Sequence, residues 1–211
     1  MTAFLSLADA IALRTKPVTG KRGGATVTAD WWAGVAITDR IRSRFQRPAD
    51  WSTLTHGEQL VFTLHCALDA EVKNGGVHQY LTNSSGDDAE GVKRYLSELG
   101  ATGLRAMFDE VSTLFPDAVI PSDRAKRWAI LSPSQEDARL AVTDQLEQVE
   151  RRYAAHWDDL WRRVMDYVET HRTDFEQPAD SGAAQSERRS QSKARRTSKA
   201  HPKRSKGRKK P

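Results

Sequence analysis

The chain has 211 residues with a formal net charge of +5, and 38% of the residues are hydrophobic. This length suits one ordinary domain with an extension, the single cysteine excludes an intramolecular disulfide and a cysteine-based zinc site, and the apolar runs are too short to predict a membrane span. Residues 58–176 carry 13 basic and 22 acidic side chains, net −9, whereas residues 177–211 carry 12 basic and 2 acidic, net +10. The basic net charge therefore comes from the end of the chain, and the longest segment is acidic.

The first part of the chain predicts two helices with a linker between them. Residues 1–14 fit an amphipathic helix better than a signal peptide, because Asp9 interrupts the apolar run and no cleavage site follows. Residues 15–28 are rich in Gly, Lys and Thr and predict a flexible linker. The next segment is predicted to end at Pro48, and its apolar residues lie near helical spacing: Trp32, Val35, Ala36, Ile37, Ile41 and Phe45.

Helical patterns continue through the rest of the acidic segment. Thr55 and Glu58 have the spacing of a capping box and open a helix whose apolar stripe reaches Val72. Later helices are predicted with these boundaries: an acidic first turn at Asp87 and Asp88 with a stop at Gly100; Leu104 to Pro116; a short helix capped by Ser122; and a long stretch from a Ser134 cap to Arg172, broken near residues 154–158. No segment alternates as a strand does. The predicted fold class is therefore all-α, a compact domain of about seven to nine helices.

The domain boundaries follow from these patterns. Residues 1–14 form the N-terminal helix, residues 15–28 the linker and residues 29–176 the all-helical domain. After Asp180 the chain has no Val, Ile, Leu, Met, Phe, Tyr or Trp. Such a segment cannot bury enough apolar surface to offset its ordering entropy, so residues 177–211 are predicted to be a disordered basic tail.

The stretch EVKNGGVHQYLTNSSG, residues 71–86, places two adjacent glycines between helical segments. Gly75 and Gly76 predict a sharp corner, because glycine accepts positive φ without steric cost. Glu71 is expected to accept free N–H groups at the next helix start, within a satisfied polar network: Glu71, Asn74, Gln79 and Asn83. Tyr80 is predicted to enter the core. The remaining residues predict a polar turn with one side-chain cap for the next helix: Asn83, Ser84, Ser85 and Gly86.

The pattern Glu71-x-x-Asn74-Gly75-Gly76-x-x-Gln79-Tyr80-x-x-Asn83-Ser84-x-Gly86 resembles a family of uncharacterised bacterial domains, the one named after the C-terminal domain of DNA mimic protein 19. The resemblance spans residues 54–171 and leaves out the N-terminal helix, the linker and the tail. It implies an all-helical fold and supplies no known catalytic residues. One member imitates DNA with surface carboxylates to bind a transcription factor, but most members have no assigned function.

No other group of residues predicts catalysis or metal binding. His65 and Asp69 are interpreted as a helix-surface pair, because no H-E-x-x-H motif or cysteine pair is present. Cys66 is interpreted as a small buried hydrophobe, and Ser84 and Ser85 lack the elbow motif of a nucleophile. No catalytic residue, metal or cofactor is therefore predicted. The tryptophans are expected mostly in the core: Trp31, Trp32, Trp51, Trp128, Trp157 and Trp161.

The tail is predicted to contact nucleic acid through its twelve basic residues: Arg188, Arg189, Lys193, Arg195, Arg196, Lys199, Lys203, Arg204, Lys206, Arg208, Lys209 and Lys210. A polycation of this kind binds phosphates by releasing counterions and reads no sequence. A solubilising extension, or one that folds back on the acidic body, is an alternative. The overall prediction is a non-enzymatic interaction module whose acidic body binds an unknown protein partner in the cytoplasm, without membrane contact. A homodimer, association with the nucleoid, and a small-ligand-binding site or enzyme at the Glu71–Asn83 corner stay open.

Overall fold

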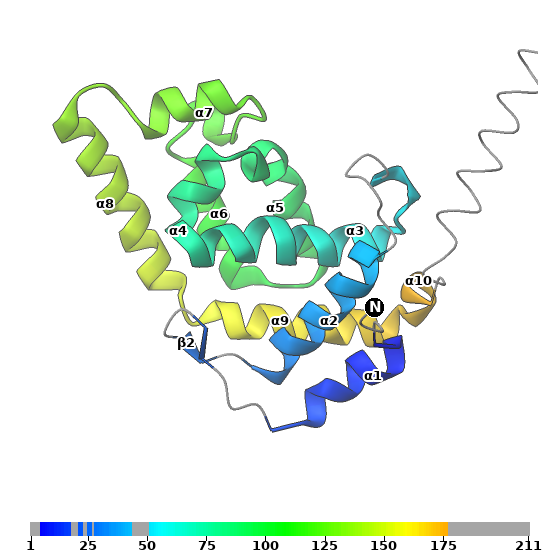
Figure 1. The fold of residues 1–211 in the computed structure, drawn as a ribbon. Coiled ribbons are helices and arrows are strands. Elements are labelled where there is room, and N and C mark those ends of the chain that lie inside the picture. The colour runs from blue at the N-terminus through cyan, green and yellow to red at the C-terminus, as the bar shows by residue number, and fades with distance from the viewer. Residues whose placement is uncertain (1–4, 18–20, 23–24, 27, 44–50, 177–211) are drawn as a thin grey trace, which may run out of the picture.

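The computed structural model describes residues 5–17, 21–22, 25–26, 28–43 and 51–176. These residues form an almost wholly helical body, which confirms the predicted fold class (Figure 1). The α-helices are α1 (Leu7–Ala12), α2 (Ala29–Ser43), α3 (His56–Phe62), α4 (Ala70–Thr82), α5 (Ala89–Glu98), α6 (Thr102–Ser112), α7 (Arg124–Leu131), α8 (Glu136–Tyr153), α9 (His156–Thr170) and α10 (Arg172–Phe175). Shorter turns of 3-10 helix are η1 (Leu13–Thr15), η2 (Trp51–Thr53), η4 (Ser84–Asp88) and η5 (Pro116–Ala118), and η3 (Thr63–Asp69) is a π-helix.

Two strands of two residues each lie within the segment predicted as a linker. β1 (Lys21–Arg22) pairs antiparallel with β2 (Ala25–Thr26). A Gly-Gly pair separates the two strands in the sequence, and this dipeptide between short strands is a hairpin signal that the linker interpretation overlooked.

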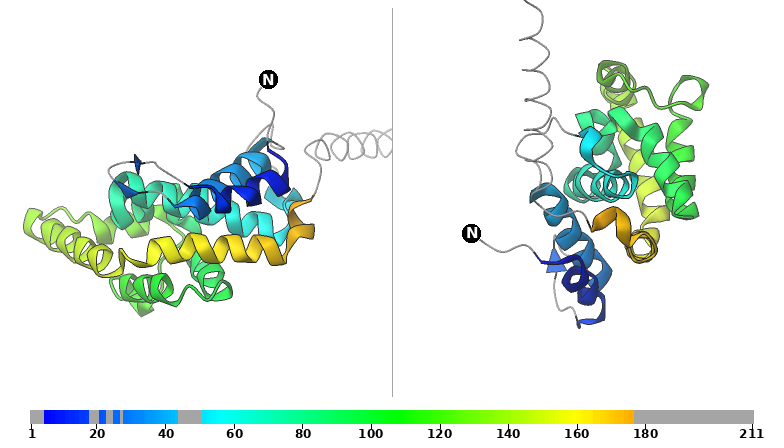
Figure 2. Two further views of the ribbon diagram at one scale, coloured as in Figure 1. Left: turned by 90° about the horizontal axis from the view of Figure 1, so that it is seen from below. Right: turned by 90° about the vertical axis from the view of Figure 1, so that its right-hand side faces the viewer.

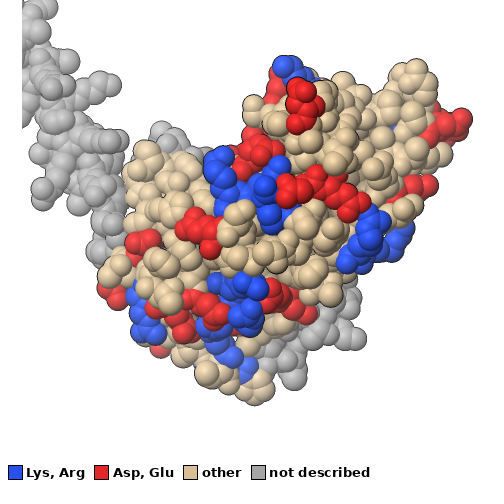
Figure 3. All heavy atoms as spheres, turned by 180° about the vertical axis from the view of Figure 1, so that it is seen from behind, with Lys and Arg blue, Asp and Glu red and all other residues tan. Residues whose placement is uncertain are grey.

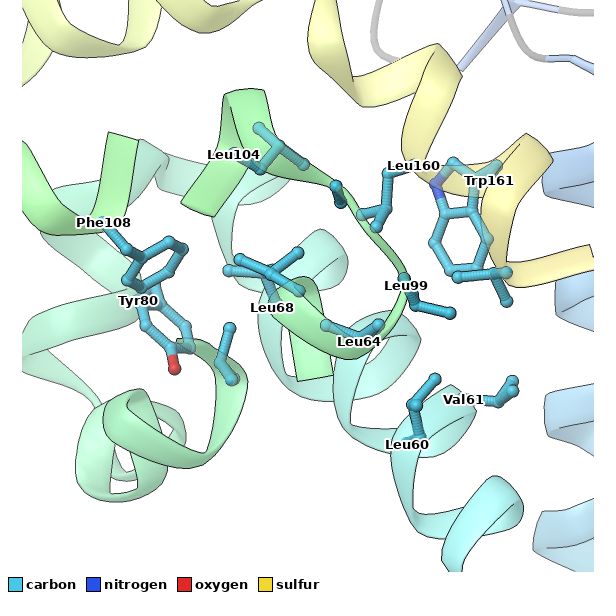
Figure 4. Close-up of a cluster of buried hydrophobic side chains, with 14 of the residues drawn as sticks. Leu60, Val61, Leu64, Leu68, Tyr80, Leu99, Leu104, Phe108, Leu160 and Trp161 are labelled. Atoms are coloured by element: carbon cyan, nitrogen blue, oxygen red, sulfur yellow. The ribbon is translucent and has the colours of Figure 1, made fainter. Parts of the chain in front are cut away.

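The centre of the body is one run of helical turns, α3, η3 and α4, from His56 to Thr82 (Figure 1). The predicted capping box opens it: the Glu58 N–H donates to Thr55 Oγ1 at 3.2 Å, and the Thr55 N–H donates to Glu58 Oε2 at 3.1 Å. The apolar stripe of this run is fully buried from Leu60 to Leu68 and half-buried at Val72, and it packs against side chains of α6 and α9 (Figure 4). The residues of this core include Leu60, Leu64, Leu68, Leu104, Phe108, Leu160 and Trp161. Removal of this apolar surface from water is the main force that holds the helices together.

Helices α2 and α9 lie side by side, with α1 on the far side of α2 (Figure 2). Their close approach depends on Gly34, where a Cβ would lie 2.9 Å from ring carbons of Trp161. Arg14, in η1, joins the same helices by ion pairs, 2.6 Å to Asp30 on α2 and 2.8 Å to Glu169 on α9. The N-terminal helix therefore packs on the domain as part of it.

Helix α8 projects at the other end of the body, with α7 beside its start (Figure 1). Its C-terminal half packs on α4 and α6 through Leu146 and Val149, which are buried. Its N-terminal half is exposed, including Leu140 at 54%. Trp128 on α7 is 50% exposed. This end of the molecule thus presents large apolar side chains to solvent.

Two predicted helix caps were wrong. Asp123 rather than Ser122 caps α7, and its Oδ1 accepts the N–H groups of the next two helical residues, Ala125 at 2.8 Å and Lys126 at 3.1 Å. Both residue types are good caps, so the sequence did not distinguish them. Gln135 rather than Ser134 precedes α8, and it makes no side-chain cap.

Other predicted boundaries fare differently. The stop after α5 is confirmed at Gly100, which has φ 64°, and so is the break, because α8 ends and α9 begins near Ala154. Asp87 and Asp88 lie in η4, one turn before α5, and not in its first turn. Phe45, Pro48 and the tail, residues 177–211, lie outside the described residues.

The prediction of a mostly buried set of tryptophans was wrong. Trp31 and Trp161 are buried, whereas Trp32, Trp51 and Trp128 are 40–50% exposed. Trp31 and Trp32 are adjacent in α2, and neighbouring residues on a helix point about 100° apart. Only one of them can face the core, and the apolar pattern pointed to the wrong one.

Candidate functional site

The two glycines bend the helical run as predicted. Gly75 has φ −159° and ψ 27°, and Gly76 has φ 76° and ψ −179°, both outside helical values. A Cβ on Gly76 would lie 2.6 Å from Glu150 Oε1. Glycine is therefore required at position 76 by its positive φ, and a Cβ there would also displace the Glu150 carboxylate.

Glu71 connects the two sides of this bend. Its Oε2 accepts the side-chain amides of Gln79 at 2.7 Å and Asn83 at 2.8 Å, and its Oε1 accepts Ser85 Oγ at 3.4 Å. The hydrogen bond from Gln79, with those from Asn83 and Ser85, lowers the pKa of Glu71. The structure thus brings together three of the four residues of the predicted network, Glu71, Gln79 and Asn83, and adds Ser85.

Two details of that prediction were wrong. The side chain of Asn74 is exposed and makes no hydrogen bond to any described residue. The free N–H at the start of the second half of α4, that of Val77, donates to Glu150 Oε1 on α8 at 2.5 Å and not to Glu71. Burial raises the pKa of Glu150. No local signal could have identified Glu150, because it lies 73 residues away in sequence.

The remaining motif residues lock the end of α4. Tyr80 is fully buried, as predicted, and packs edge-on against Phe108 with ring centroids 5.8 Å apart. Burial raises its pKa, and its hydroxyl has no partner among the described residues. Gly86 lies under the same segment, where a Cβ would be 2.9 Å from the carbonyl oxygen of Tyr80. Ser84 is exposed.

Arg127 of α7 fixes this turn, and no motif in the sequence pointed to it. Its buried guanidinium donates to the carbonyl oxygens of Leu81 at 2.6 Å and Asn83 at 2.9 Å, and to Asp87 Oδ1 at 2.6 Å. The side-chain cap predicted from the turn is absent: neither Asn83, before η4, nor Asp88, before α5, makes a capping hydrogen bond, and the Asn83 amide donates to Glu71 instead. Three side chains therefore hold the second half of α4 and its end: Glu71, Arg127 and Glu150.

A cavity of about 450 Å³ lies beside the bend, lined by Gly75, Gly76, His78, Thr143, Leu146, Glu147, Glu150 and Arg151. Glu71, Gln79 and Asn83 do not line it. The polar groups of the motif bond to one another. Of the two carboxylates that line the cavity, Glu150 already accepts a backbone N–H and Glu147 pairs with Arg151. This arrangement suits a structural brace between α4, α7 and α8.

The π-helix η3 holds a second polar cluster, and three predictions fail there. Asp69 is 2% exposed rather than on the surface, and it accepts the indole N–H groups of Trp31 at 3.0 Å and Trp161 at 3.3 Å. His65 packs among the same rings, and burial lowers its pKa to about 4. Cys66 is half-buried rather than fully buried, and burial raises its pKa. The predicted apolar residues of this segment, Leu64 and Leu68, are buried, but the apolar pattern carries no information on the burial of the polar residues between them.

Acidic and basic side chains are interleaved on the face shown in Figure 3. Several carboxylates of the body are paired; Arg162, for example, contacts Asp159 at 2.5 Å and Asp166 at 2.9 Å. Others form no ion pair with a described residue, among them Glu136, Asp137 and Asp144 on α8, and Asp158, Asp174 and Glu176 near the end of the body. Within the described part of the chain, no group of three metal-ligating side chains is placed to hold a metal ion.

The chain is thus a helical domain, and the residues of the motif from Glu71 to Gly86 hold the bend in its central helical run. The model of the DMP19-like protein family matches residues 52–171, more than half of the chain, and the chain belongs to this family. The match agrees with the resemblance carried by the motif. No curated protein and no solved structure matches the chain. None of the described helices combines the length and apolar character that crossing a bilayer requires.

Proposed function

We propose that this protein is a non-enzymatic interaction module. Its helical body binds a protein partner through the exposed face of α8, and residues 177–211 contact nucleic acid without reading sequence. The observation that carries this proposal is the division of charge, −9 over residues 58–176 against +10 over residues 177–211. One chain with both signs can bring a protein and a nucleic acid together.

The exposed face of α8 has the composition of a protein-binding surface. From Glu136 to Glu150 the helix carries five carboxylates and one cation, Arg139, net −4. Asp137 and Asp144 are exposed two helical turns apart, with exposed Leu140 between them. Apolar anchors surrounded by polar groups are typical of interfaces, and tryptophans such as Trp128 on adjacent α7 are frequent anchors.

A DNA-mimic role is the narrower form of the proposal, supported by membership of the family. A mimic presents carboxylates where DNA presents phosphates. On α8, Glu136, Asp137 and Asp144 form no ion pair with a described residue and lie along one exposed helix. Mimicry by this protein would therefore be local to α8 and would use its free carboxylates.

The alternative site, at the Glu71–Asn83 corner, has less support. A ligand there would have to displace internal hydrogen bonds of 2.7 and 2.8 Å to Glu71. Buried groups that already bond to one another gain little from a ligand. The brace accounts for the same residues without one.

The test of the body compares two double variants by affinity capture from nuclease-treated lysate. Asp137→Asn/Asp144→Asn removes two charges from α8, and Asp158→Asn/Glu176→Gln, a matched control, removes two exposed charges elsewhere. A protein captured by the body is expected to be lost with the first variant and retained with the second. Equal capture by both variants would contradict the proposed surface.

The test of the tail is a salt titration of fluorescent duplexes against the full chain and a chain ending at Gln177. The full chain is expected to bind any sequence, with a log–log salt slope of about −0.9 for each phosphate contact. The shortened chain is expected not to bind, because an acidic surface repels phosphate. Undiminished binding by the shortened chain, or strong preference for one sequence, would reject this half of the proposal.

A further inference from the structure

A cavity of about 520 Å³ lies where the π-helix interrupts the central helical run. Its walls come from α2 and from η3 with the start of α4: Trp31, Val35, Asp39, Arg42, His65, Cys66, Asp69, Ala70, Lys73 and Asn74. The volume falls within the range of about 300–1,000 Å³ that is usual for small-molecule sites. None of the signature glycines of the bend lines it.

The π-helix explains why polar side chains gather at this point. An added residue per turn shifts the side chains that follow, and such segments inside α-helices are frequent at functional sites. Here the segment Thr63–Asp69 turns His65 and Asp69 toward the tryptophans of α2 and α9, and it places Cys66 against Arg42.

On the inner wall of the cavity, each charged group has a partner of opposite charge. Both oxygens of Asp69 are occupied by indole N–H groups, and Lys73 Nζ lies 2.9 Å from Oδ1. His65 is neutral at pH 7, since burial lowers its pKa to about 4. Its Nε2 is buried without a partner among the described residues. Val35 and Ala70 add apolar surface.

Two cations line the cavity, Lys73 and Arg42. Lys73 is paired with buried Asp69, whereas Arg42 lies at the mouth and is the more exposed of the two. One of its nitrogens, Nη2, donates to Cys66 Sγ at 3.0 Å, and Nη1 lies 3.5 Å from Asp39 Oδ1. A guanidinium has five N–H donors, and this side chain is 59% exposed. Most of its donors are therefore accessible to a molecule that enters the cavity.

We infer that this cavity binds a small organic carboxylate, held at the mouth by the Arg42 guanidinium, with its apolar part against Val35, Ala70 and Cys66. The planar fork of arginine matches a carboxylate in two parallel hydrogen bonds. Asp39 balances Arg42 when no ligand is bound, and an entering carboxylate competes with it. Loss of the Asp39 charge should therefore strengthen binding, which a merely structural cluster would not show.

The test uses benzoate as the probe, in equilibrium dialysis against the full chain at constant ionic strength set with chloride. One saturable site is expected, with a Kd on the order of millimolar. Arg42→Gln is expected to weaken binding about tenfold, through loss of charge-assisted hydrogen bonds. Asp39→Asn is expected to strengthen it about threefold. Arg139→Gln, which removes the same charge from exposed α8, is the matched control and should leave the affinity unchanged.

A second measurement locates the site. Cys66 is the only cysteine of the chain, so its alkylation by uncharged N-ethylmaleimide reports on this cavity alone. Benzoate is expected to slow the reaction in the wild type and not in Arg42→Gln. The inference is overturned if benzoate shows no saturable binding, if Arg42→Gln binds as the wild type does, or if Arg139→Gln weakens binding equally.

Discussion

The central helical run departs from α-helical geometry twice, at Gly75–Gly76 and at η3, and the two sites differ in how their polar groups are used. At the bend, Glu71 accepts from three side chains, so the polar groups satisfy one another. At η3, Asp69 is satisfied in the same way, but Arg42 keeps accessible donors beside a cavity. The bend carries the conspicuous motif, yet its polar groups satisfy one another and brace the fold. The π-helix carries no motif, yet a cavity with accessible hydrogen-bond donors lies beside it.

The largest effect is expected from Asp69→Ala. Two buried indole N–H groups and the Lys73 ammonium lose their acceptor at once, and removing one member of a buried charged cluster costs about 3–5 kcal/mol. The free energy of unfolding from urea titration measures this. Asp39→Ala, on the exposed side of the same cavity, is the control and should change stability by less than about 0.5 kcal/mol. Similar curves for both variants would show that Asp69 is not the centre of this cluster.

The bend can be disrupted by Gly76→Val, with an expected loss of about 2–4 kcal/mol. A β-branched residue is strained at φ 76°, and its Cβ would meet the Glu150 carboxylate. Gly76→Ala should cost less, because it adds only the Cβ. Thermal and urea unfolding provide the measurement. A melting curve for Gly76→Val that matches the wild type would rule out the bend as a constraint.

The brace is tested by Glu71→Ala and Asn83→Ala, each expected to lower stability by about 1–3 kcal/mol because a partner is left unpaired. The double variant should lose less than the sum of the two, since the residues share one hydrogen bond. A cycle of four urea curves gives this coupling. If both single variants kept full stability and lost a bound small molecule instead, the ligand-site interpretation of the corner would replace the brace.

The sequence predicted the bend because its cause is local. Positive φ at Gly76 and the pairing of Glu71 with Gln79 and Asn83 depend on residues within one short stretch, where spacing determines which side chains share a face. The partners from other elements were missed for the opposite reason. Glu150 and Arg127 reach the bend only after α8 and α7 have folded back on α4, and nothing near them in sequence marks that approach.

The π-helix shows a different limit. A pattern of apolar residues assumes about 100° per residue, and one extra residue in a turn rotates everything after it. The apolar stripe was predicted correctly, since Leu64 and Leu68 are buried, whereas the burial of the polar residues His65 and Asp69 beside it was not. Trp31 and Trp32 show the same sensitivity, since a rotation of one residue decides which ring enters the core. The family resemblance could not correct these errors, because it concerned the bend.

The smallest expected effect is a difference between the two sites in how stability depends on pH. Burial lowers the pKa of His65 from 6.5 to about 4, so the fold favours the neutral ring. Its contribution to stability is fully present above pH 6.5 and is lost as the pH falls toward 4. The charged groups around it, Asp69 and Asp39, oppose this shift, whereas Lys73 and Arg42 add to it. Glu71 also has a lowered pKa, from 4.5, so its contribution is lost only below about pH 4.5.

Between pH 6.5 and pH 5, the imidazole of the unfolded chain takes up a proton, whereas His65 in the folded protein stays neutral because its pKa is about 4, and Glu71 stays ionised. The wild type is expected to lose about 1–2 kcal/mol over this interval through His65. His65→Gln should flatten the pH dependence of the urea midpoint there, and Glu71→Gln should leave that slope unchanged while removing acid sensitivity below pH 4.5. If His65→Gln kept the wild-type slope, the ring would not be held neutral in the folded protein, and the inner wall of the cavity would carry a charge at mildly acidic pH.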